Sequence, residues 1–496
     1  MTATTLATHD ETTPPPPRLS TADRRGWLGV GAITLLLAAT WAPRLTMPYG
    51  DNHMGRIISR YALHLANLQE RGIVGSDFSA DWAPYSSAAY AHHPPGLNIL
   101  VALFGLLPGK QEFQVWLAPF VLALLVVPAG AALLRGLGIR WPATLLAVGL
   151  MASTTFFWVY SPIMFDLGPI LLISAMVVVL RRRDYDPPRR LLVIACAAAL
   201  LATLISWPGI GFAGAMGLWL LAGRRRVDRV VVAVGAAMLI GLLISLTFIV
   251  GVSGVADLTN QAEFRTQGGA FTWEQFFRRQ KLSLEALLPP WYLLLLAAGA
   301  VVGLWDRRTR AYLAFAVAFN AFWTFGLNNG AYIHDYWNYP LLILGLVGMG
   351  TLLDHALGRL PARPALMAAT VTALALVVAL GTIVLGRTNR VYVDGPADAG
   401  RLVSQHTPAP GQQTAWLAGG GLSTPRWYAY YWNLPPKSVT PETLATNQAN
   451  PPDLVLMDLR RIPNWLPKTI GDRALDREGS YALLRIADLK AAQLKP

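Results

Sequence analysis

Residues 113–134, FQVWLAPFVLALLVVPAGAALL, form an apolar run without a single charged side chain. A run of this length is enough to cross the roughly 30 Å of hydrocarbon in a bilayer. It is apolar on every side, whereas a surface helix of a soluble bundle keeps a polar stripe for water. Comparable runs recur from Trp27 to Gly386. The sequence therefore predicts an all-α, polytopic membrane protein.

The composition supports this class, since 54% of the residues are hydrophobic, 14% are charged and the mean hydropathy is +0.40. The formal net charge of +13 could suggest a nucleic-acid partner. The arginines, however, gather in short clusters between the apolar runs: Arg24 with Arg25, Arg135 with Arg140, Arg181–Arg183, Arg224–Arg226, Arg307 and Arg308 with Arg310, and Arg359 with Arg363. Such clusters mark cytoplasmic loops. The charge therefore indicates topology, and we expect no nucleic-acid partner.

Charge parity predicts about eleven crossings of a plasma (inner) membrane, with the N-terminus in the cytoplasm. A disordered cytoplasmic tail over 1–26 precedes a transmembrane domain over 27–386. The expected spans are 27–45, 113–134, 141–160, 164–180, 190–206, 208–222, 230–251, 287–304, 311–327, 339–354 and 364–386. The extracytoplasmic loops are then 46–112, 252–286 and 328–338.

Two segments do not fit a simple span. Residues 95–109 are apolar but short, and a crossing there would move the later arginine clusters to the outside, so we expect a helix that does not cross. Residues 387–496 lose the long apolar runs and carry strand-like stretches at 415–417, 454–457 and 481–484. These features predict a small extracytoplasmic α/β domain.

Asp51 opens the first outer loop and precedes a predicted amphipathic helix. The apolar residues of this helix recur at helical spacing, at Met54, Ile57, Ile58, Tyr61, Leu65 and Leu68. Such a helix lies in the interface plane, with Arg56, Arg60, His64 and Asn67 mostly on its other sides. The helix dipole favours an ionised carboxylate at its N-terminus. Asp51 is thus a candidate functional acid, and a simple helix cap remains the alternative.

Asp166 lies in the turn SPIMFDLGP, residues 161–169, between two expected spans. A carboxylate in such apolar chain is costly unless it meets a cation, a metal or a ligand. Charge parity brings Asp166 to the same membrane face as Asp51, and we expect the two acids to share a pocket. A cap at the start of the next helix is again the alternative.

The third outer loop carries cations on a side of the membrane that otherwise has few. Arg265, Arg278, Arg279 and Lys281 are interleaved there with aromatic side chains. Cations in this position suggest an anion such as a lipid phosphate. A solvated rim that touches lipid headgroups is the alternative.

Two histidine positions complete the outer face. His93 begins the helix after His92, before Pro94 and Pro95, and His334 with Asp335 stands in an aromatic stretch just before an outer span end. A histidine can bind metal, contact phosphate or relay a proton. A helix-starting turn and an interfacial aromatic belt are the alternatives.

In this order, the pieces resemble the bacterial branch of the GT-C membrane glycosyltransferases, which includes the protein O-mannosyltransferases and the aminoarabinose transferase. Members carry a first-loop acid, a His-Pro-Pro segment, a second acid after a Ser-Pro turn and a charged third loop. The resemblance covers about 24–390. It matches Asp51 and Asp166 to the two acids, and His93 to a position where the aminoarabinose transferase has a metal-binding glutamate. The usual Asp-Glu is Asp51-Asn52 here, which removes one carboxylate.

The resemblance implies sugar transfer from a polyprenyl-phosphate-linked donor to a hydroxyl of a lipid, glycan or protein at the outer face, among membrane lipids. We expect Asp51 and Asp166 to be catalytic and Arg265, Arg278, Arg279 and Lys281 to bind the donor phosphate. Substrate contacts are expected from Arg56, His93, His334 and Asp335. Whether His93 and His334 hold a divalent metal stays open. A transporter or lipid flippase, and a structural subunit, are the alternative functions.

Overall fold

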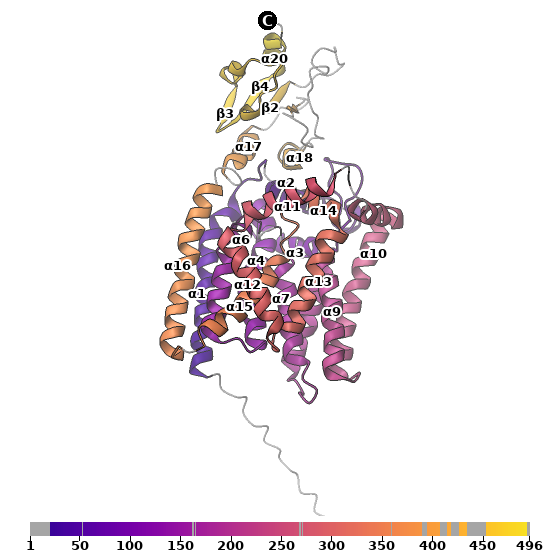
Figure 1. Ribbon diagram of the computed structural model, residues 1–496. Helices are drawn as coiled ribbons and strands as arrows, with labels where there is room; N and C mark the ends of the chain where they lie inside the picture. The colour runs from indigo at the N-terminus through magenta and orange to yellow at the C-terminus, as the bar shows by residue number, and fades with distance from the viewer. Residues whose placement is uncertain are drawn as a thin grey trace, which may run out of the picture.

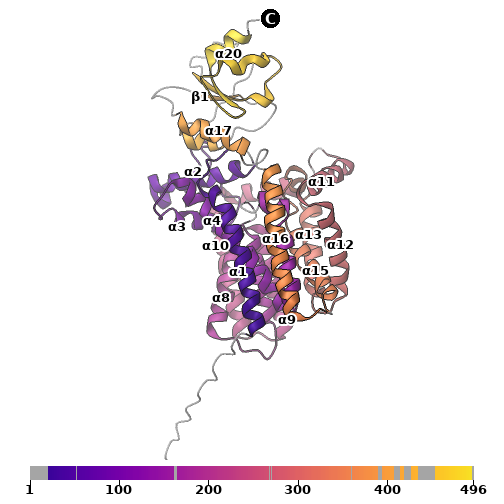
Figure 2. The same cartoon turned by 90° about the vertical axis from the view of Figure 1, so that its left-hand side faces the viewer.

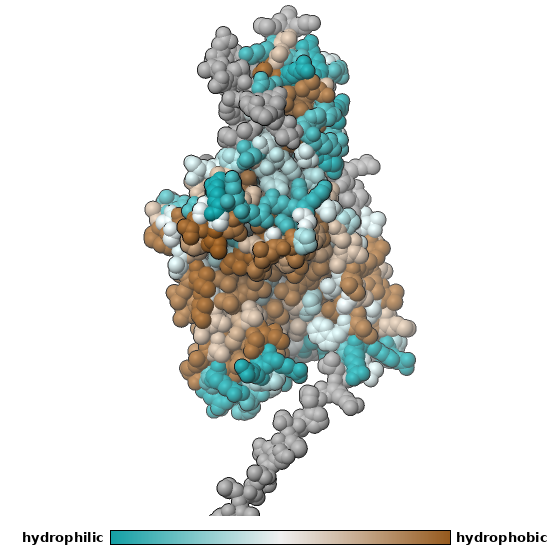
Figure 3. Space-filling view, turned by 180° about the vertical axis from the view of Figure 1, so that it is seen from behind, coloured by the Kyte–Doolittle hydropathy of each residue, from teal (hydrophilic) through white to brown (hydrophobic). Residues whose placement is uncertain are grey.

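The computed structural model describes residues 20–51, 53–160, 163, 165–266, 269, 271–358, 360–388, 394–406, 414–417, 426–433 and 453–493. Helices pack side by side in a bundle, and a small sheet lies beyond one end of it (Figure 1). On the face shown in Figure 3, a broad apolar belt crosses the bundle, with hydrophilic residues toward both ends. This is the surface of a multi-pass membrane protein.

Four helices of the described chain are long and apolar enough to cross a membrane. They are α1 (Thr21–Trp41, continued by the 3₁₀ turn η1, Ala42–Thr46), α4 (Gln111–Gly136), α10 (Arg229–Thr266) and α16 (Ala362–Thr388). A fifth candidate is the pair α11 (Trp273–Leu287) and α12 (Pro290–Trp305), which bends by 106°. Shorter apolar helices are α5 (Trp141–Ala152), α7 (Leu167–Leu180) and α15 (Leu341–Ala356). The count of about eleven crossings stays a prediction.

The remaining helices of the bundle and its outer loops are α2 (His53–Gly75), α3 (Gly96–Phe104), α6 (Thr155–Tyr160), α8 (Arg189–Ile205), α9 (Trp207–Arg224), α13 (Arg310–Ala321), η2 (Phe322–Gly326) and α14 (Asn328–Ile333). Helix α3 has only 9 residues. At 1.5 Å per residue it extends roughly 14 Å, too little to cross. This short length fits the predicted non-crossing helix, whose position in the membrane stays a prediction.

The predicted disordered tail, 1–26, overlaps the start of the first helix. Its first part, 1–19, lies outside the described residues, but α1 already begins at Thr21. The Ser20 side chain accepts a hydrogen bond from the Asp23 backbone N–H, which caps the helix. A serine in this position satisfies one of the free N–H groups at a helix start.

The predicted cytoplasmic arginine clusters meet at the end of the bundle opposite the sheet. Arg140 Nε and Arg308 Nη1 both donate to the buried Asp354 carboxylate, each at 2.9 Å. Arg224 Nη1 donates to the carbonyls of Leu180 and Arg182, at 2.8 and 3.0 Å. Clusters from separate loops therefore share one end, as charge parity requires. The side of the membrane on which this end lies stays a prediction.

Two close backbone approaches in the fold require glycine. A Cβ placed on Gly299 of α12 would lie 2.5 Å from the carbonyl carbon of Gly348 in α15. Helices in membranes commonly approach through such small residues. A Cβ on Gly400 would lie 1.8 Å from the Tyr49 carbonyl oxygen. Gly400 belongs to α17 (Asp394–Gln405), so this second contact joins the C-terminal domain to the first outer loop.

The C-terminal domain contains a mixed sheet in the order β1-β2-β4-β3. Its elements are β1 (Thr414–Leu417), α18 (Arg426–Trp432), β2 (Leu454–Asp458), η4 (Leu459–Arg461), η5 (Lys468–Arg473), β3 (Asp476–Glu478), β4 (Tyr481–Arg485) and α20 (Ile486–Gln493). The three predicted strands are confirmed, whereas β3 was not predicted because its sequence, Asp-Arg-Glu, is wholly charged. Strand β1 is parallel to β2, and the other pairs are antiparallel. Helix α17 lies between the sheet and α2 (Figure 2).

Successive side chains along the strands point to opposite faces of the sheet and pack in two separate hydrophobic cores. Leu456 and its cross-strand partner Leu483 belong to the main core, which continues into the bundle. Val455 and Leu484 point to the opposite face and pack in a second, smaller core. This alternation is the ordinary consequence of the two-residue period of a strand. The sheet is therefore packed against the rest of the protein on one face, not suspended on a linker.

Candidate active site

The polar side of α2 is buried, although the sequence pattern alone placed it away from the membrane. Arg60, His64 and Asn67 are all less than 7% exposed. Asn67 Nδ2 donates to the carbonyls of Asp81 and Ala83, at 3.1 and 3.0 Å. The chain after α2 therefore folds back over the helix and covers its polar side. Helical periodicity could not reveal this, because it reports which residues share a face and not what covers that face.

Asp51 lies just before α2 and is paired with Arg56. Arg56 Nε and Nη2 both donate to the same oxygen of Asp51, Oδ1, at 2.9 and 2.5 Å. Burial and then the nearby negative charge of Asp51 raise the pKa of Tyr481 in strand β4. Asp51 therefore lies close to the C-terminal sheet. Arg56, which we expected to contact substrate, contacts the candidate base instead.

Asp166 is buried at a junction of three helices and is only 3% exposed. The Ser206 hydroxyl at the start of α9 donates to its Oδ2 at 2.6 Å. The Tyr339 hydroxyl, just before α15, donates to the same oxygen at 2.5 Å. Asp166 precedes α7, yet its side chain makes no capping hydrogen bond. The helix-cap alternative is therefore wrong for this side chain.

The two aspartates do not share a partner among the described residues. Asp51 is bound by Arg56, whereas Asp166 is bound by Ser206 and Tyr339. Neither acid lines the cavity between α2, α4 and α18. A joint role of the two acids therefore stays a prediction, and each needs its own test.

Arg265, His334 and His93 are brought close together from three loops. Arg265 Nη1 lies 3.0 Å from His334 Nε2, and its guanidinium carbon lies 5.4 Å from the Trp337 ring centre. The His334 ring stacks against Trp337 at 5.7 Å. Burial lowers the pKa of His93 well below its ordinary value, and the charges of Arg60 and Arg265 lower it further. His93 is therefore a neutral imidazole at neutral pH.

The other predicted cations lie further out on α11. Arg278, Arg279 and Lys281 are exposed. Arg279 Nε donates to the Tyr332 carbonyl at 3.4 Å, and Lys281 is 3.8 Å from Glu285. The alternative of a solvated rim fits these three better than it fits Arg265.

Asp335 is held by a neighbouring helix. The Tyr160 hydroxyl, at the end of α6, donates to Asp335 Oδ2 at 2.6 Å. This bond fixes the stretch that also carries His334. Asp335 therefore helps to position this loop, and the expected contact with a substrate stays a prediction.

The arrangement does not favour a metal at His93 and His334. Over the described ranges, no group of three or more His, Cys, Asp or Glu side chains is placed to hold an ion. The Arg265 guanidinium carries only donors, so His334 Nε2 accepts its hydrogen bond and has no lone pair left for a metal. Two positive guanidiniums near His93 also oppose a cation there.

Sequence analysis did not single out two arginines at this site. The Arg60 guanidinium lies over the Tyr90 ring, 4.1 Å from its centre. Arg426, at the start of α18, lies over Trp82 at 5.1 Å. Arg60 follows Arg56 by one helical turn, a spacing visible in the sequence. No sequence signal connects Arg426 to the first loop, because the contact is made only when the chain is folded.

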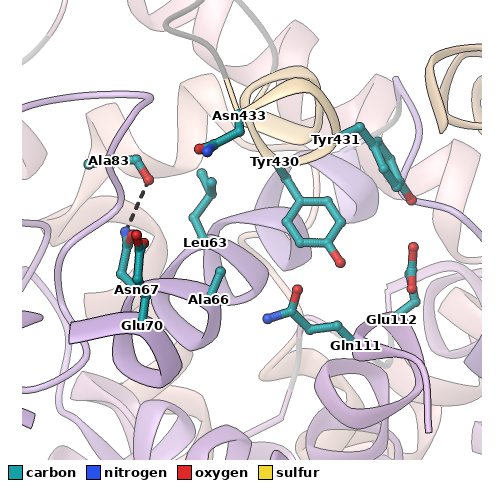
Figure 4. A pocket seen from close by; sticks show the side chains of 10 residues that line it. All are labelled: Leu63, Ala66, Asn67, Glu70, Ala83, Gln111, Glu112, Tyr430, Tyr431 and Asn433. Carbon is teal, nitrogen blue, oxygen red and sulfur yellow. Dashed lines mark hydrogen bonds between the residues drawn. The ribbon is translucent and has the colours of Figure 1, made fainter. Parts of the chain in front are cut away.

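A cavity of about 310 Å³ opens between α2, the start of α4 and α18 (Figure 4). It is lined by Leu63, Ala66, Asn67, Glu70, Ala83, Gln111, Glu112, Tyr430, Tyr431 and Asn433. The Tyr430 ring points across the cavity toward Gln111 (Figure 4). The Tyr49 backbone N–H donates to the Tyr431 hydroxyl at 2.8 Å and so fixes α18 to the first loop. The lining is predominantly polar, which suits a hydrophilic ligand.

Neither a family model nor a curated protein matches the sequence. Two solved structures of ArnT from Cupriavidus metallidurans do match the fold, one bound to undecaprenyl phosphate and one in the apo state, with TM-scores of 0.54 and 0.53. The fold is that of ArnT. Both ArnT structures are 14% identical and cover 93% of this chain and 98% of theirs, so the likeness includes most of the C-terminal domain.

A second membrane enzyme is similar over most of its length. The archaeal oligosaccharyltransferase AglB from Archaeoglobus fulgidus, solved with an inhibitory peptide and a dolichol-phosphate, has a TM-score of 0.47 and 11% identity. The match covers 88% of this chain and 69% of AglB. The predicted GT-C-like fold is confirmed by the ArnT match.

Proposed function

We propose that this protein is a membrane glycosyltransferase. It moves a sugar from a polyprenyl-phosphate-linked donor to a hydroxyl of a lipid, glycan or protein acceptor at the outer face of the membrane. The observation that carries this proposal is the ArnT-like fold over almost the whole of both chains, in a neighbour that was solved with undecaprenyl phosphate. In this orientation the N-terminus is cytoplasmic and the sheet lies outside.

The donor phosphate is proposed to bind at Arg265. The bond between the sugar carbon and the phosphate oxygen breaks and the polyprenyl phosphate leaves as an anion, so fixed cations stabilise the charge that develops on it. Arg265 stands at the end of α10 with His334 and Trp337 beside it, and its charge also acts on the neutral His93. The exposed cations of α11 attract the anionic headgroup while the lipid diffuses in the membrane.

The acceptor hydroxyl needs a base, and Asp51 is the candidate. Arg56 Nε and Nη2 both donate to Oδ1, so Oδ2 takes no part in this ion pair. This second oxygen can take the proton as the new bond forms, which typically contributes about 10² to 10⁴ in rate. A single displacement of this kind inverts the configuration at the sugar carbon.

Asp166 is proposed to bind the sugar or acceptor through hydroxyl contacts. Its carboxylate already organises the hydroxyls of Ser206 and Tyr339, one from each of two further helices. A ligand hydroxyl that reaches this junction would join the same network. Because the carboxylate is buried, it would act by fixed hydrogen bonds and not by exchange with water.

The test compares cells that carry the natural protein with cells that carry Asp51→Asn, at matched protein levels. Mass spectrometry of envelope lipids and glycans should find a sugar-modified product only with the natural protein. Asp186→Asn is the matched control, since Asp186 pairs with Arg229 on an exposed surface at the opposite end. Equal product from Asp51→Asn would remove the base assignment.

A purified assay separates donor binding from chemistry. Arg265→Gln should raise KM for the lipid-linked donor and also lower kcat, because its charge is proposed to bind the donor phosphate and to stabilise the negative charge that develops on it. A larger effect on the acceptor would contradict this role. Movement of the lipid across a proteoliposome membrane without any sugar transfer would support the transporter alternative instead.

A further inference from the structure

Helix α18 of the C-terminal domain lies along α2 in a parallel direction. At one end, Arg426 Nη1 donates to the Arg56 carbonyl at 3.3 Å. At the other end, Tyr430 and Asn433 line the cavity together with residues 63–70 of α2. The two helices therefore flank the cavity, and Arg60 and Arg426 lie on the same two helices just before its first lining residues, Leu63 and Tyr430.

One arginine at this end is buried, the other is half-buried, and neither has a carboxylate partner in the described part of the chain. Arg60 is 6% exposed, its Nη2 donates to the Tyr61 hydroxyl at 2.9 Å, its guanidinium also contacts Tyr90, and its buried Nε has no partner among the described residues. The buried Nε of Arg426 also has none. In the part of the chain that the structure describes, neither guanidinium forms an ion pair.

Two guanidinium cations that lie close together repel each other. Arg60 lies over the Tyr90 ring and Arg426 over the Trp82 ring, and the centres of these two rings are 4.8 Å apart. The guanidiniums are therefore neighbours, and burial and then the charge of Arg60 lower the pKa of Arg426. Buried charges are ordinarily paired, because leaving one uncompensated is strongly destabilising. An anion between the two guanidiniums removes both the repulsion and the unsatisfied donors.

The residues that line the cavity restrict the kind of ligand that can bind beside the arginines. Glu70 and Glu112 line the cavity, so an anion is repelled from it and favoured at the arginine end. Tyr430, Gln111 and Asn433 offer an aromatic ring and amides, which suit a neutral, hydroxyl-rich group. The charges therefore favour an anion at the two arginines and a neutral, polar group in the cavity.

We propose that Arg60 and Arg426 form an oxyanion site for a phosphate group, and that the adjoining cavity takes a sugar of the same ligand. The ligand class is therefore a phosphate-bearing glycan or glycolipid. The two residues of this site differ from Arg265, which is proposed to bind the donor phosphate. If the ligand of this site is the acceptor, that role rests on the proposed function. The oxyanion site itself does not depend on that function.

The test measures binding to the full-length protein in lipid nanodiscs, with inorganic phosphate as one probe and undecaprenyl phosphate as the other. Arg60→Gln and Arg426→Gln should each weaken phosphate binding about tenfold, seen by ³¹P NMR titration. Arg71→Gln is the matched control, because it removes the same charge from α2 but its guanidinium already pairs with Asp81 at 2.5 Å.

The two probes distinguish the source of the anion. Loss of affinity for inorganic phosphate assigns the site to a soluble or acceptor phosphate, and loss for undecaprenyl phosphate alone assigns it to the lipid. Arg60→Lys should retain most of the binding, since it keeps the charge in the folded protein. Unchanged binding of both probes in the two Gln variants, or an equal loss in Arg71→Gln, overturns the proposal.

Failure of this proposal and failure of the proposed function have different signatures. The binding measurement needs no turnover. Arginine-dependent phosphate binding in a protein that transfers no sugar would keep the oxyanion site and refute the glycosyltransferase. If both Gln variants still transfer sugar and bind phosphate as the natural protein does, the glycosyltransferase proposal is kept and the oxyanion site is refuted.

Discussion

Replacing Asp166 separates its packing role from a role in chemistry. Asp166→Ala leaves the hydroxyls of Ser206 and Tyr339 without their acceptor in a place that water does not reach. Each unsatisfied buried donor costs about 1–3 kcal/mol, so we expect a loss of about 2–6 kcal/mol in the free energy of unfolding.

Asp166→Asn should behave differently. The amide oxygen still accepts from the hydroxyls, although its hydrogen bonds are roughly half as strong as those of a carboxylate. The neutral side chain also avoids the cost of burying a charge, which is several kcal/mol. These two effects oppose each other, and we expect the net change to stay within about 1 kcal/mol.

The assay is unfolding in detergent by heat and by sodium dodecyl sulfate, read by near-ultraviolet circular dichroism, beside the sugar-transfer measurement. Asp166→Asn should fold normally and lose transfer, by about 10² or more if the carboxylate binds a substrate hydroxyl. If Asp166→Ala is as stable as the natural protein, the hydrogen-bond geometry described for this residue is wrong. Full transfer by a folded Asp166→Asn would refute the functional role and leave a packing role.

Three further predictions concern stability. The hydrogen bond from Arg308 lowers the pKa of Asp306 from 3.8 to about 2, so this carboxylate contributes stability that is fully present above about pH 5 and is lost as the pH falls toward 2. Asp306→Asn should flatten that pH dependence by about 1 kcal/mol between pH 7 and pH 3, measured as the unfolding midpoint at each pH. Gly400→Ala should force α17 away from Tyr49 and speed proteolytic release of the C-terminal domain, whereas Gly235→Ala, which has open space around its Cβ, should not. Gly348→Leu should separate α12 from α15 and lower the unfolding temperature; an unchanged temperature would contradict the close approach at Gly299.

Much of the fold could be predicted from local patterns. Long apolar runs identified α4 and α16, and arginine clusters identified the end where Arg140 and Arg308 meet Asp354. Short strand-like apolar stretches identified three of the four strands. These signals are local, because hydrophobic periodicity and charge are set by neighbouring residues. The structure of ArnT then supports the GT-C-like fold that the order of the motifs suggested.

The site was harder to predict because its contacts are not local. Asp166 was found by its charge in an apolar turn, but its partners Ser206 and Tyr339 stand 40 and 173 residues away. Arg426 contacts the Arg56 carbonyl across 370 residues, and nothing in its own neighbourhood indicates the first loop. Periodicity identified α2 and could not reveal that its polar side is covered. Only the folded chain brings these groups together.

The position of α18 on α2 also bears on the order of synthesis. Translation delivers the first outer loop early, whereas α18, which lies on α2, is made only after the whole bundle. During that interval Arg60 is open to solvent on the side that α18 later covers. A nascent chain would therefore already lie in the lipid as a bundle while still unable to retain its ligand, and this ability would arrive only once α18 has been made.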